Sequence, residues 1–467
     1  MTTTTRSRGL RSACDRCYQL KERCERASAT CSCERCERLG QACLTVRPAR
    51  RTGRQANRWE QTTSQNLSSQ STSSTQSRHL TGSWLRKSTD LSLEEKDHLT
   101  FLLGNSQTLQ YSVVSPRFKD AVQESLAVKL PAAWPILKDA YMAYAGVLKS
   151  LQCGSTTDLD QDSNLRHVNA AMIALRSLAI TKPEDADLCL TLGYALALSV
   201  YAAIGVGVSD ICHYCLNITS PYIETAAVNP ETEPQIHFLV LLETMECLVH
   251  RRKPTLRIPS PGLRSVDRHL GLSLPLLPYY HDLCFISYSL LNSTDAKPAS
   301  LLRQLEDIQD HVERWQPSHP EGFVHEYSTA EVIQLLAQAR VYRLGALLLI
   351  HRLQHQFGQQ DSQADIWSRE VMMELELARR ISSRPVRFVT LPFIIAAVEV
   401  KDPTERNIVV KNVDHYVDQF TPVVQKATKT FLSRVWHERD TQECFSWLDS
   451  IHKPCVVMES IRGSLIC

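Results

Sequence analysis

Seven of the chain's sixteen cysteines lie within thirty consecutive residues, in the segment "CDRCYQLKERCERASATCSCERCERLGQAC" at 14–43. The segment contains the same unit twice, offset by nineteen residues: Cys14-x2-Cys17-x6-Cys24 and Cys33-x2-Cys36-x6-Cys43. Cys31 is the cysteine left over, because using it in place of Cys33 would break the internal repeat.

Thiolates at this spacing indicate a metal site. A structural zinc ion takes four ligands in a tetrahedron, so the three thiolates of one unit cannot complete a site. The six thiolates of both units can hold two zinc ions if two of the thiolates bridge both metals. The spacing therefore predicts a binuclear cluster with two zinc ions.

Two other uses of clustered cysteines are a disulfide framework and an iron–sulfur site. The N-terminal stretch "MTTTTRSRGLRSAC" has no apolar signal core, which predicts a reducing compartment, where clustered cysteines more often hold metal. The usual four-cysteine spacings of iron–sulfur sites do not produce a doubled three-cysteine unit. Zinc is the favoured interpretation.

In order and spacing, the six cysteines resemble the binuclear zinc-cluster domain of fungal transcription regulators. The resemblance implies a short helix after each C-x2-C, bridging ligands Cys14 and Cys33, and four terminal ligands in the remaining cysteines of the repeat. It also implies that Lys21, on the first helix, reads a CGG triplet in the major groove of double-stranded DNA. The loop "ERASATCS" lacks the proline that many members have there.

The two halves of the repeat differ in their long cations. Gly40 stands in the second half where Lys21 stands in the first, and Ala42 where Arg23 stands. Lysine and arginine are the side chains that reach guanine O6 and N7 in the major groove. Arg16, Arg23 and Arg26 are expected to contact phosphates, which position a module without reading sequence. Plain solvation of a small domain is the alternative.

Charge is concentrated at the start of the chain. Residues 1–58 hold fourteen Lys or Arg and five Asp or Glu, an excess of nine positive charges in a chain of net charge +2. Such a basic head is typical of nucleic-acid binding by one end of a protein. Arg47, Arg50 and Arg51 extend it and are expected to contact DNA, although a nuclear import signal or a solvated linker would look the same.

The rest of the chain changes character twice. Residues 47–90 are first basic and then rich in Ser, Thr and Gln, which predicts a flexible linker without a sustained coiled-coil heptad. Residues 91–467 show helical periodicity and no nucleotide-binding glycine pattern, so we expect a large all-α domain behind a zinc-cluster domain at 1–46. Capping boxes are predicted at Ser92 with Glu95, Thr181 with Glu184 and Ser328 with Glu331, and Gly104 and Gly358 are predicted to stop helices.

One apolar run is long enough to cross a bilayer. Residues 188–208 contain no charge, but they include three glycines and follow acidic residues suited to the start of a soluble helix. We expect a buried helix and no membrane contact. The C-x2-C at Cys212 and Cys215 has no second pair at ligand spacing, so core thiols are expected there.

The helical body also resembles the regulatory region of the same fungal regulators, in "ECLVHRRKPTLR", "VDRHLGLSLPLLPYYHDLC" and "IIAAVEVKDPTERN". The resemblance implies a nuclear transcription factor of RNA polymerase II genes that contacts the transcription machinery or co-regulator proteins. It also allows a homodimer and a pathway-specific role in fungal secondary metabolism. An enzyme is not expected, because no H-E-x-x-H, G-x-S-x-G or comparable motif is present. A co-regulator that uses the cluster as a protein-docking scaffold is the alternative.

Overall fold

The computed structural model describes residues 13–21, 23–25, 31–44, 91–104, 109, 112–153, 158–229, 233–259, 266–292 and 299–441. The chain divides into two compact units, residues 1–69 and 70–467, called here the head and the helical unit. The predicted linker at 47–90 lies outside the described residues. The predicted domain boundaries at residues 46 and 90 stay predictions for the same reason.

The described part of the helical unit is built from helices alone, apart from one isolated bridge between Asp267 and Gly271. The predicted all-α class is therefore confirmed. The α-helices are α4 (Leu93–Gly104), α6 (Lys119–Ala132), α7 (Trp134–Cys153), α8 (Asp158–Ser177), α9 (Pro183–Ala203), α10 (Val208–Glu224), α11 (Gln235–His250), α12 (Leu277–Asn292), α13 (Ala299–Arg314), α14 (Phe323–Glu326), α15 (Thr329–Gln354), α16 (Asp361–Ser382), α17 (Thr390–Ala397), α18 (Pro403–Tyr416) and α19 (Pro422–Asp440). Two short 3-10 helices are η2 (Pro116–Phe118) and η3 (Leu274–Leu276).

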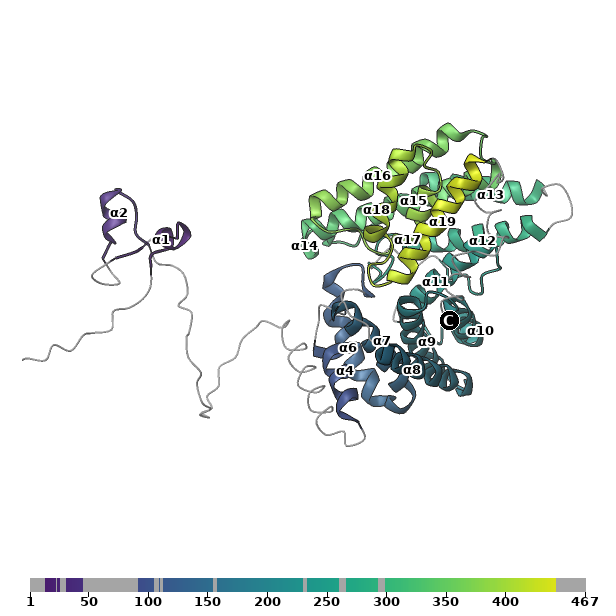
Figure 1. Cartoon of the computed structure of the whole chain (residues 1–467), viewed down its shortest axis with the longest axis horizontal. Helices are drawn as coiled ribbons and strands as arrows, with labels where there is room; N and C mark the ends of the chain where they lie inside the picture. The colour runs from purple at the N-terminus through teal and green to yellow at the C-terminus, as the bar shows by residue number, and fades with distance from the viewer. Residues whose placement is uncertain are drawn as a thin grey trace, which may run out of the picture. The chain divides into compact units, whose positions relative to one another are not determined.

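Two central helices organise the packing of this unit (Figure 1). Helix α9 packs against α7, α8, α10, α11 and α19, and helix α15 packs against α12, α13, α16 and α17. The buried side chains form one continuous hydrophobic core that extends from Leu91 to Trp436. The helical unit therefore has a single core. The long apolar helices α9 and α15 each lie at the centre of one group of helices within it.

The apolar run at 188–208 is the buried helix that its composition predicts, but the helix is shorter than the run. Helix α9 ends at Ala203, and Gly205 and Gly207 adopt positive φ angles of +74° and +78° before α10 begins. Both α9 and α15 are long and apolar enough to cross a membrane by length and composition. In each, 78% of the most apolar window is buried inside the unit, which accounts for the hydrophobic sequence.

The predicted helix starts are partly confirmed. Ser92 with Glu95 and Ser328 with Glu331 form reciprocal capping hydrogen bonds, and α4 ends at Gly104. The predicted box at Thr181 is wrong, because the Thr181 N–H and hydroxyl both donate to the carboxylate of Asp185. Asp185 therefore takes the role predicted for the residue before it. At the other end of α15, the helix stops at Gln354, before the predicted stop at Gly358.

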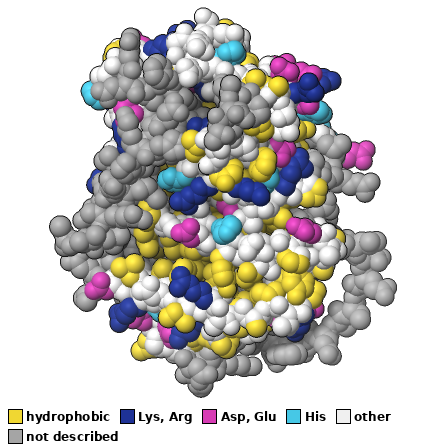
Figure 2. Space-filling view, turned by 90° about the vertical axis from the view of Figure 1, so that its right-hand side faces the viewer, with side chains coloured by type: hydrophobic (Ala, Val, Ile, Leu, Met, Phe, Trp, Pro, Cys, Tyr) yellow, Lys and Arg dark blue, Asp and Glu magenta, His cyan; other side chains and the backbone are white. Residues whose placement is uncertain are grey.

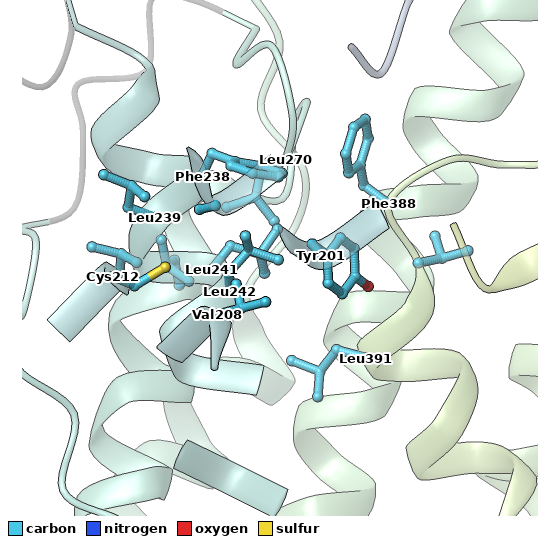
Figure 3. Close-up of a cluster of buried hydrophobic side chains, with 14 of the residues drawn as sticks. Tyr201, Val208, Cys212, Phe238, Leu239, Leu241, Leu242, Leu270, Phe388 and Leu391 are labelled. Atoms are coloured by element: carbon cyan, nitrogen blue, oxygen red, sulfur yellow. The ribbon is translucent and has the colours of Figure 1, made fainter. Parts of the chain in front are cut away.

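Aromatic side chains from distant segments meet in the core, between α11 and the loop before α17 (Figure 3). Phe388, in the loop before α17, packs edge-on against Phe238 of α11 with ring centroids 6.2 Å apart. Phe388 has a φ of +51°, which is strained for a bulky residue. The Tyr342 hydroxyl donates to the Phe388 carbonyl at 2.8 Å and holds it in this conformation. The predicted core thiols Cys212 and Cys215 are fully buried in α10.

The surface of the helical unit carries charges of both signs. On the face shown in Figure 2, Lys and Arg side chains are interspersed with Asp and Glu, and hydrophobic side chains gather in the lower half. No broad basic surface dominates the described part of this face. The strong positive excess of the sequence belongs to residues 1–58.

A buried ion pair joins α15 to the segment that follows α17. Arg352 donates to both carboxylate oxygens of Glu399, at 2.9 and 2.7 Å, and each side chain is only 1% exposed. Arg352 also pairs with Asp361 at 2.8 Å, and its guanidinium lies 5.0 Å from the ring of Phe357. The guanidinium of Arg439 lies over the same ring at 4.2 Å. These charged side chains thus link four segments, which are α15, the start of α16, the segment after α17, and α19.

We predict that Glu399→Ala lowers the free energy of unfolding by about 3–5 kcal/mol, because it leaves a buried guanidinium without its main partner. The matched control is Asp310→Ala, which removes the exposed pair to Arg314 (side chains 70% and 73% exposed) and should cost at most about 1 kcal/mol. Thermal melting followed by circular dichroism measures both. Equal melting temperatures for the two variants would contradict the prediction.

Candidate metal centre and nucleic-acid interface

The repeat in the sequence is also a repeat in space. The C-x2-C of each half runs into a five-residue helix, α1 (Asp15–Gln19) in the first half and α2 (Glu34–Arg38) in the second. The N–H of the second cysteine donates to Sγ of the first at 3.5 Å in both halves, from Cys17 to Cys14 and from Cys36 to Cys33. These thiols therefore cap the two short helices.

The two halves are also cross-linked by an exchange of backbone hydrogen bonds. The N–H of Asp15 donates to the carbonyl of Leu44 at 2.9 Å, and the N–H of Glu34 donates to the carbonyl of Glu25 at 3.2 Å. Because both members of each pair are offset by nineteen residues, the head has approximate two-fold symmetry. Each half supplies the tail that caps the other half's helix.

At the centre of this symmetry the structure brings the six cysteines of the repeat together. Their sulfur atoms form two groups of four, and within each group all atoms lie within 4.8 Å of one another. The groups are Cys14, Cys17, Cys24 and Cys33, and Cys14, Cys33, Cys36 and Cys43. Cys14 and Cys33 belong to both groups, so they occupy the positions that bridging ligands require.

The sulfur separations fit tetrahedral metal coordination. Zinc–sulfur bonds of about 2.3 Å in a tetrahedron put neighbouring sulfurs about 3.8 Å apart. The Sγ atoms of Cys14 and Cys33 are 3.9 Å apart, those of Cys14 and Cys36 3.8 Å, and those of Cys17 and Cys33 3.8 Å. A disulfide needs about 2.05 Å, and none of the cysteines with described side chains forms one. The donor set therefore suits a thiolate-binding metal.

The shared thiols are also the ones most readily ionised. The hydrogen bond from the N–H of Cys36 lowers the pKa of the Cys33 thiol to about 6. Burial raises the pKa of Cys14, but the N–H of Cys17 and the neighbouring thiols outweigh burial and lower it. A bridging ligand must be a thiolate, so this bias is in the required direction.

Cys31 behaves as the residue outside the repeat. Its side chain is exposed and belongs to neither group of four, whereas Cys14, Cys17, Cys33 and Cys36 are at most 1% exposed. The odd number of cysteines in the segment is thereby explained by one surface thiol.

Lys21 lies beyond the helix on which it was expected. Helix α1 ends at Gln19, and Lys21 adopts a left-handed conformation with a φ of +52°. Its counterpart Gly40 has a φ of +58°. The turn after each helix thus needs a left-handed residue, for which glycine is the usual choice and lysine costs about 1–2 kcal/mol. The sequence could have signalled this turn, because Gly40 marks it in the second half.

The predicted arginine contacts are described only in part. Arg16 and Arg23 are both exposed on the head. Arg16 donates to the side-chain oxygen of Gln41 at 2.6 Å, a contact between the halves that sequence reasoning missed, and Arg23 pairs with Glu25 at 2.7 Å. The other predicted contacts lie outside the described residues, and these are Arg26, Arg47, Arg50 and Arg51.

Six clustered cysteines in a small head, together with a large all-helical unit, are consistent with a zinc-cluster type of regulator. A family model described as a fungal specific transcription factor domain matches residues 142–456, more than half of the chain. The chain therefore belongs to this family of fungal transcription factors. The family is not one of enzymes, and its members function in the nucleus. No curated protein and no solved structure gave a significant match.

Removing sulfur from one cysteine at a time should separate surface thiol from shared ligand. Cys31→Ser should leave the metal content of the purified chain unchanged, because Cys31 belongs to neither group of four. Cys33→Ser should lower it sharply, because both groups lose a ligand. Elemental analysis of the two proteins, prepared in parallel, is the measurement. Loss of metal from Cys31→Ser would contradict the assignment.

Proposed function

We propose that the protein is a sequence-specific DNA-binding transcription factor whose head holds two zinc ions and reads CGG-type triplets through Lys21. The observation that carries the proposal is the pair of four-sulfur groups that share Cys14 and Cys33. Two tetrahedral ions need eight ligand positions, and six thiolates provide them when two are shared. Zinc suits such an all-thiolate tetrahedron.

The conformation of Lys21 supports its role as the base reader. Strain at a non-glycine residue is retained where the side chain is needed, so an observed outlier favours a functional interpretation. The turn at Gly40 has the same backbone conformation and no side chain, and a Cβ built there meets nothing within 4 Å. At this position the two turns share a backbone conformation and differ in whether a long cation is present. Lysine can donate to guanine O6 and N7 in the major groove.

The arginines of the head have a different role in the proposal. Arg16 and Arg23 are exposed and cationic, and we assign them to phosphates, with Arg26, Arg47, Arg50 and Arg51 extending the contact along the backbone. Phosphate contacts supply affinity that depends on salt and carries no sequence information. The excess of nine positive charges in residues 1–58 fits this division of labour.

The helical unit is assigned to regulation. Its charges are mixed and its family is that of transcription factors, so contacts with co-regulator proteins or the transcription machinery fit it better than contacts with DNA. The head would then bind DNA in the nucleus, and the helical unit would contact other proteins.

The metal content tests the first part of the proposal. The full chain, purified without chelator, should contain two zinc ions, and stripping them should abolish DNA binding while the helical unit keeps its circular dichroism signal. The reason is that the head has almost no apolar core, so metal binding must supply its folding energy. If elemental analysis finds one zinc ion or none per chain, the proposal of a binuclear cluster is wrong.

The substitution Lys21→Gly tests base reading, because it copies the second half into the first. Relief of the left-handed lysine should keep or raise the stability of the head by up to about 1 kcal/mol. Loss of the side chain should reduce discrimination between CGG and scrambled duplexes by about 1–3 kcal/mol. The measurement is a pair of binding titrations at stated salt, with zinc content checked on the same samples.

Arg23→Ala is the matched control, since Arg23 lies two residues away and is also exposed. It should weaken binding to both duplexes alike and lower the salt slope by about one unit, as a phosphate contact does. If Lys21→Gly leaves the specificity ratio unchanged, another residue reads the base. If the unsubstituted protein prefers neither duplex, the cluster serves as a protein-docking scaffold instead.

A further inference from the structure

A small polar pocket lies in the helical unit between α6, α7, α9 and the start of α11. Helix α7 packs against both α6 and α9, and the three lie side by side (Figure 1). The pocket has a volume of about 50 Å³, which gives room for about three or four water-sized groups. Its apolar lining consists of Val122, Leu126 and Pro234, and its polar lining of Ser125, Lys129, Tyr141, Thr191, Tyr194, Gln235, Arg268 and His269.

The charges of this lining are unequally compensated. The ammonium of Lys129 pairs with Asp187 at 2.8 Å and with Glu233 at 2.9 Å, and neither carboxylate belongs to the lining. Burial lowers the pKa of His269 to about 4, so this side chain is neutral. The guanidinium of Arg268 is half-buried and forms no ion pair or hydrogen bond with the described part of the chain. The uncompensated positive charge of the pocket therefore belongs to Arg268.

Two hydroxyl groups of the lining have a hydrogen to donate. Tyr141 is only 3% exposed, yet its hydroxyl makes no hydrogen bond with any described residue. Thr191 is buried and accepts from Lys129 at 3.3 Å, which leaves its own hydroxyl hydrogen without an acceptor among the described residues. Buried donors in native structures nearly always have a partner. Water can supply one, but a carboxylate would also compensate the charge of the guanidinium.

The backbone that carries Arg268 is fixed by hydrogen bonds on both sides. The carbonyl of Arg268 accepts the N–H of Val114 at 2.6 Å, and the carbonyl of His269 accepts from the side chain of Gln338 at 2.9 Å. The carboxylate of Asp267 accepts the N–H of His269 at 2.8 Å. The loop is therefore held rigidly while the guanidinium stays unpaired, as in a binding site that is formed before its ligand arrives.

We propose that this pocket binds a small aliphatic monocarboxylate of about the size of propionate. The carboxylate would pair with Arg268 and accept hydrogen bonds from the hydroxyls of Tyr141 and Thr191. The short alkyl chain would lie against Val122 and Leu126. The site goes beyond the proposed reading of DNA and does not depend on it, because no residue of the head lines the pocket.

Other occupants suit the pocket less well. A cation would meet two positive side chains of the lining, Lys129 and Arg268. A dianion such as inorganic phosphate would bring a second negative charge close to Asp187 and Glu233, which already surround Lys129. Larger organic acids exceed the volume of about 50 Å³.

A titration of the zinc-loaded full chain with propionate tests the proposal, with propionamide as the uncharged control of the same shape. Saturation-transfer NMR at constant ionic strength should detect propionate and give an affinity at least about tenfold higher than that for propionamide, because only the carboxylate pairs with a guanidinium. No transfer to propionate, or equal binding of the two compounds, would overturn the proposal.

Two substitutions locate the site. Arg268→Gln should weaken propionate binding at least about tenfold, whereas Arg176→Gln, an exposed arginine of α8 outside the lining, should leave it unchanged. Tyr141→Phe should weaken binding about fivefold. Its melting temperature without ligand should stay the same, because the lost hydroxyl has no partner among the described residues.

The matched control for Tyr141→Phe is Tyr144→Phe. Tyr144 lies one turn further along α7, is also 3% exposed and does not line the pocket, so this variant should bind propionate like the unsubstituted protein. Full binding by Arg268→Gln, or an equal loss in Tyr141→Phe and Tyr144→Phe, would show that propionate binds elsewhere and that the assignment of the pocket is wrong.

Discussion

The head depends on one constraint, which is that six sulfur atoms have to replace a hydrophobic core. The buried cluster of the head consists of Cys14, Cys17, Cys33 and Cys36, with the half-buried Cys24 and Cys43 packed against it. Three leucines of the same segment are exposed instead, since Leu20, Leu39 and Leu44 keep about half of their surface or more in water. A fold of this kind has little apolar burial to offset its ordering entropy, so its stability has to come from whatever the sulfurs bind.

The local geometry of the head follows from that constraint. Helices of five residues are far too short to be stable alone, and each is held by a cysteine that caps it and by a tail from the other half. The N–H groups of Cys17 and Cys36, which the capping thiols accept, also lower the pKa of the shared thiols. Helix capping and the lowered pKa of the shared thiols are therefore one structural event, repeated once in each half.

The sequence revealed what is encoded locally and missed what is encoded across distance. The clustered cysteines, the Ser328 capping box and the buried helix at 183–203 are each indicated by patterns within a short stretch of sequence. The structure shows all three. The Arg352–Glu399 pair could not be predicted, because its members are separated by 47 residues and meet only in the folded chain.

Lys21 is an intermediate case, because both halves of the repeat are visible in the sequence. The sequence shows a change of side chain from Gly40 to Lys21, and the structure shows that the backbone is left-handed at both positions. The repeat therefore fixes the backbone and the positions of the clustered thiols together, and departures from the repeat alter the side chains that project from it. In the proposed function, a symmetric scaffold that carries one long cation at an otherwise glycine position binds metal equally in both halves and recognises DNA with one of them.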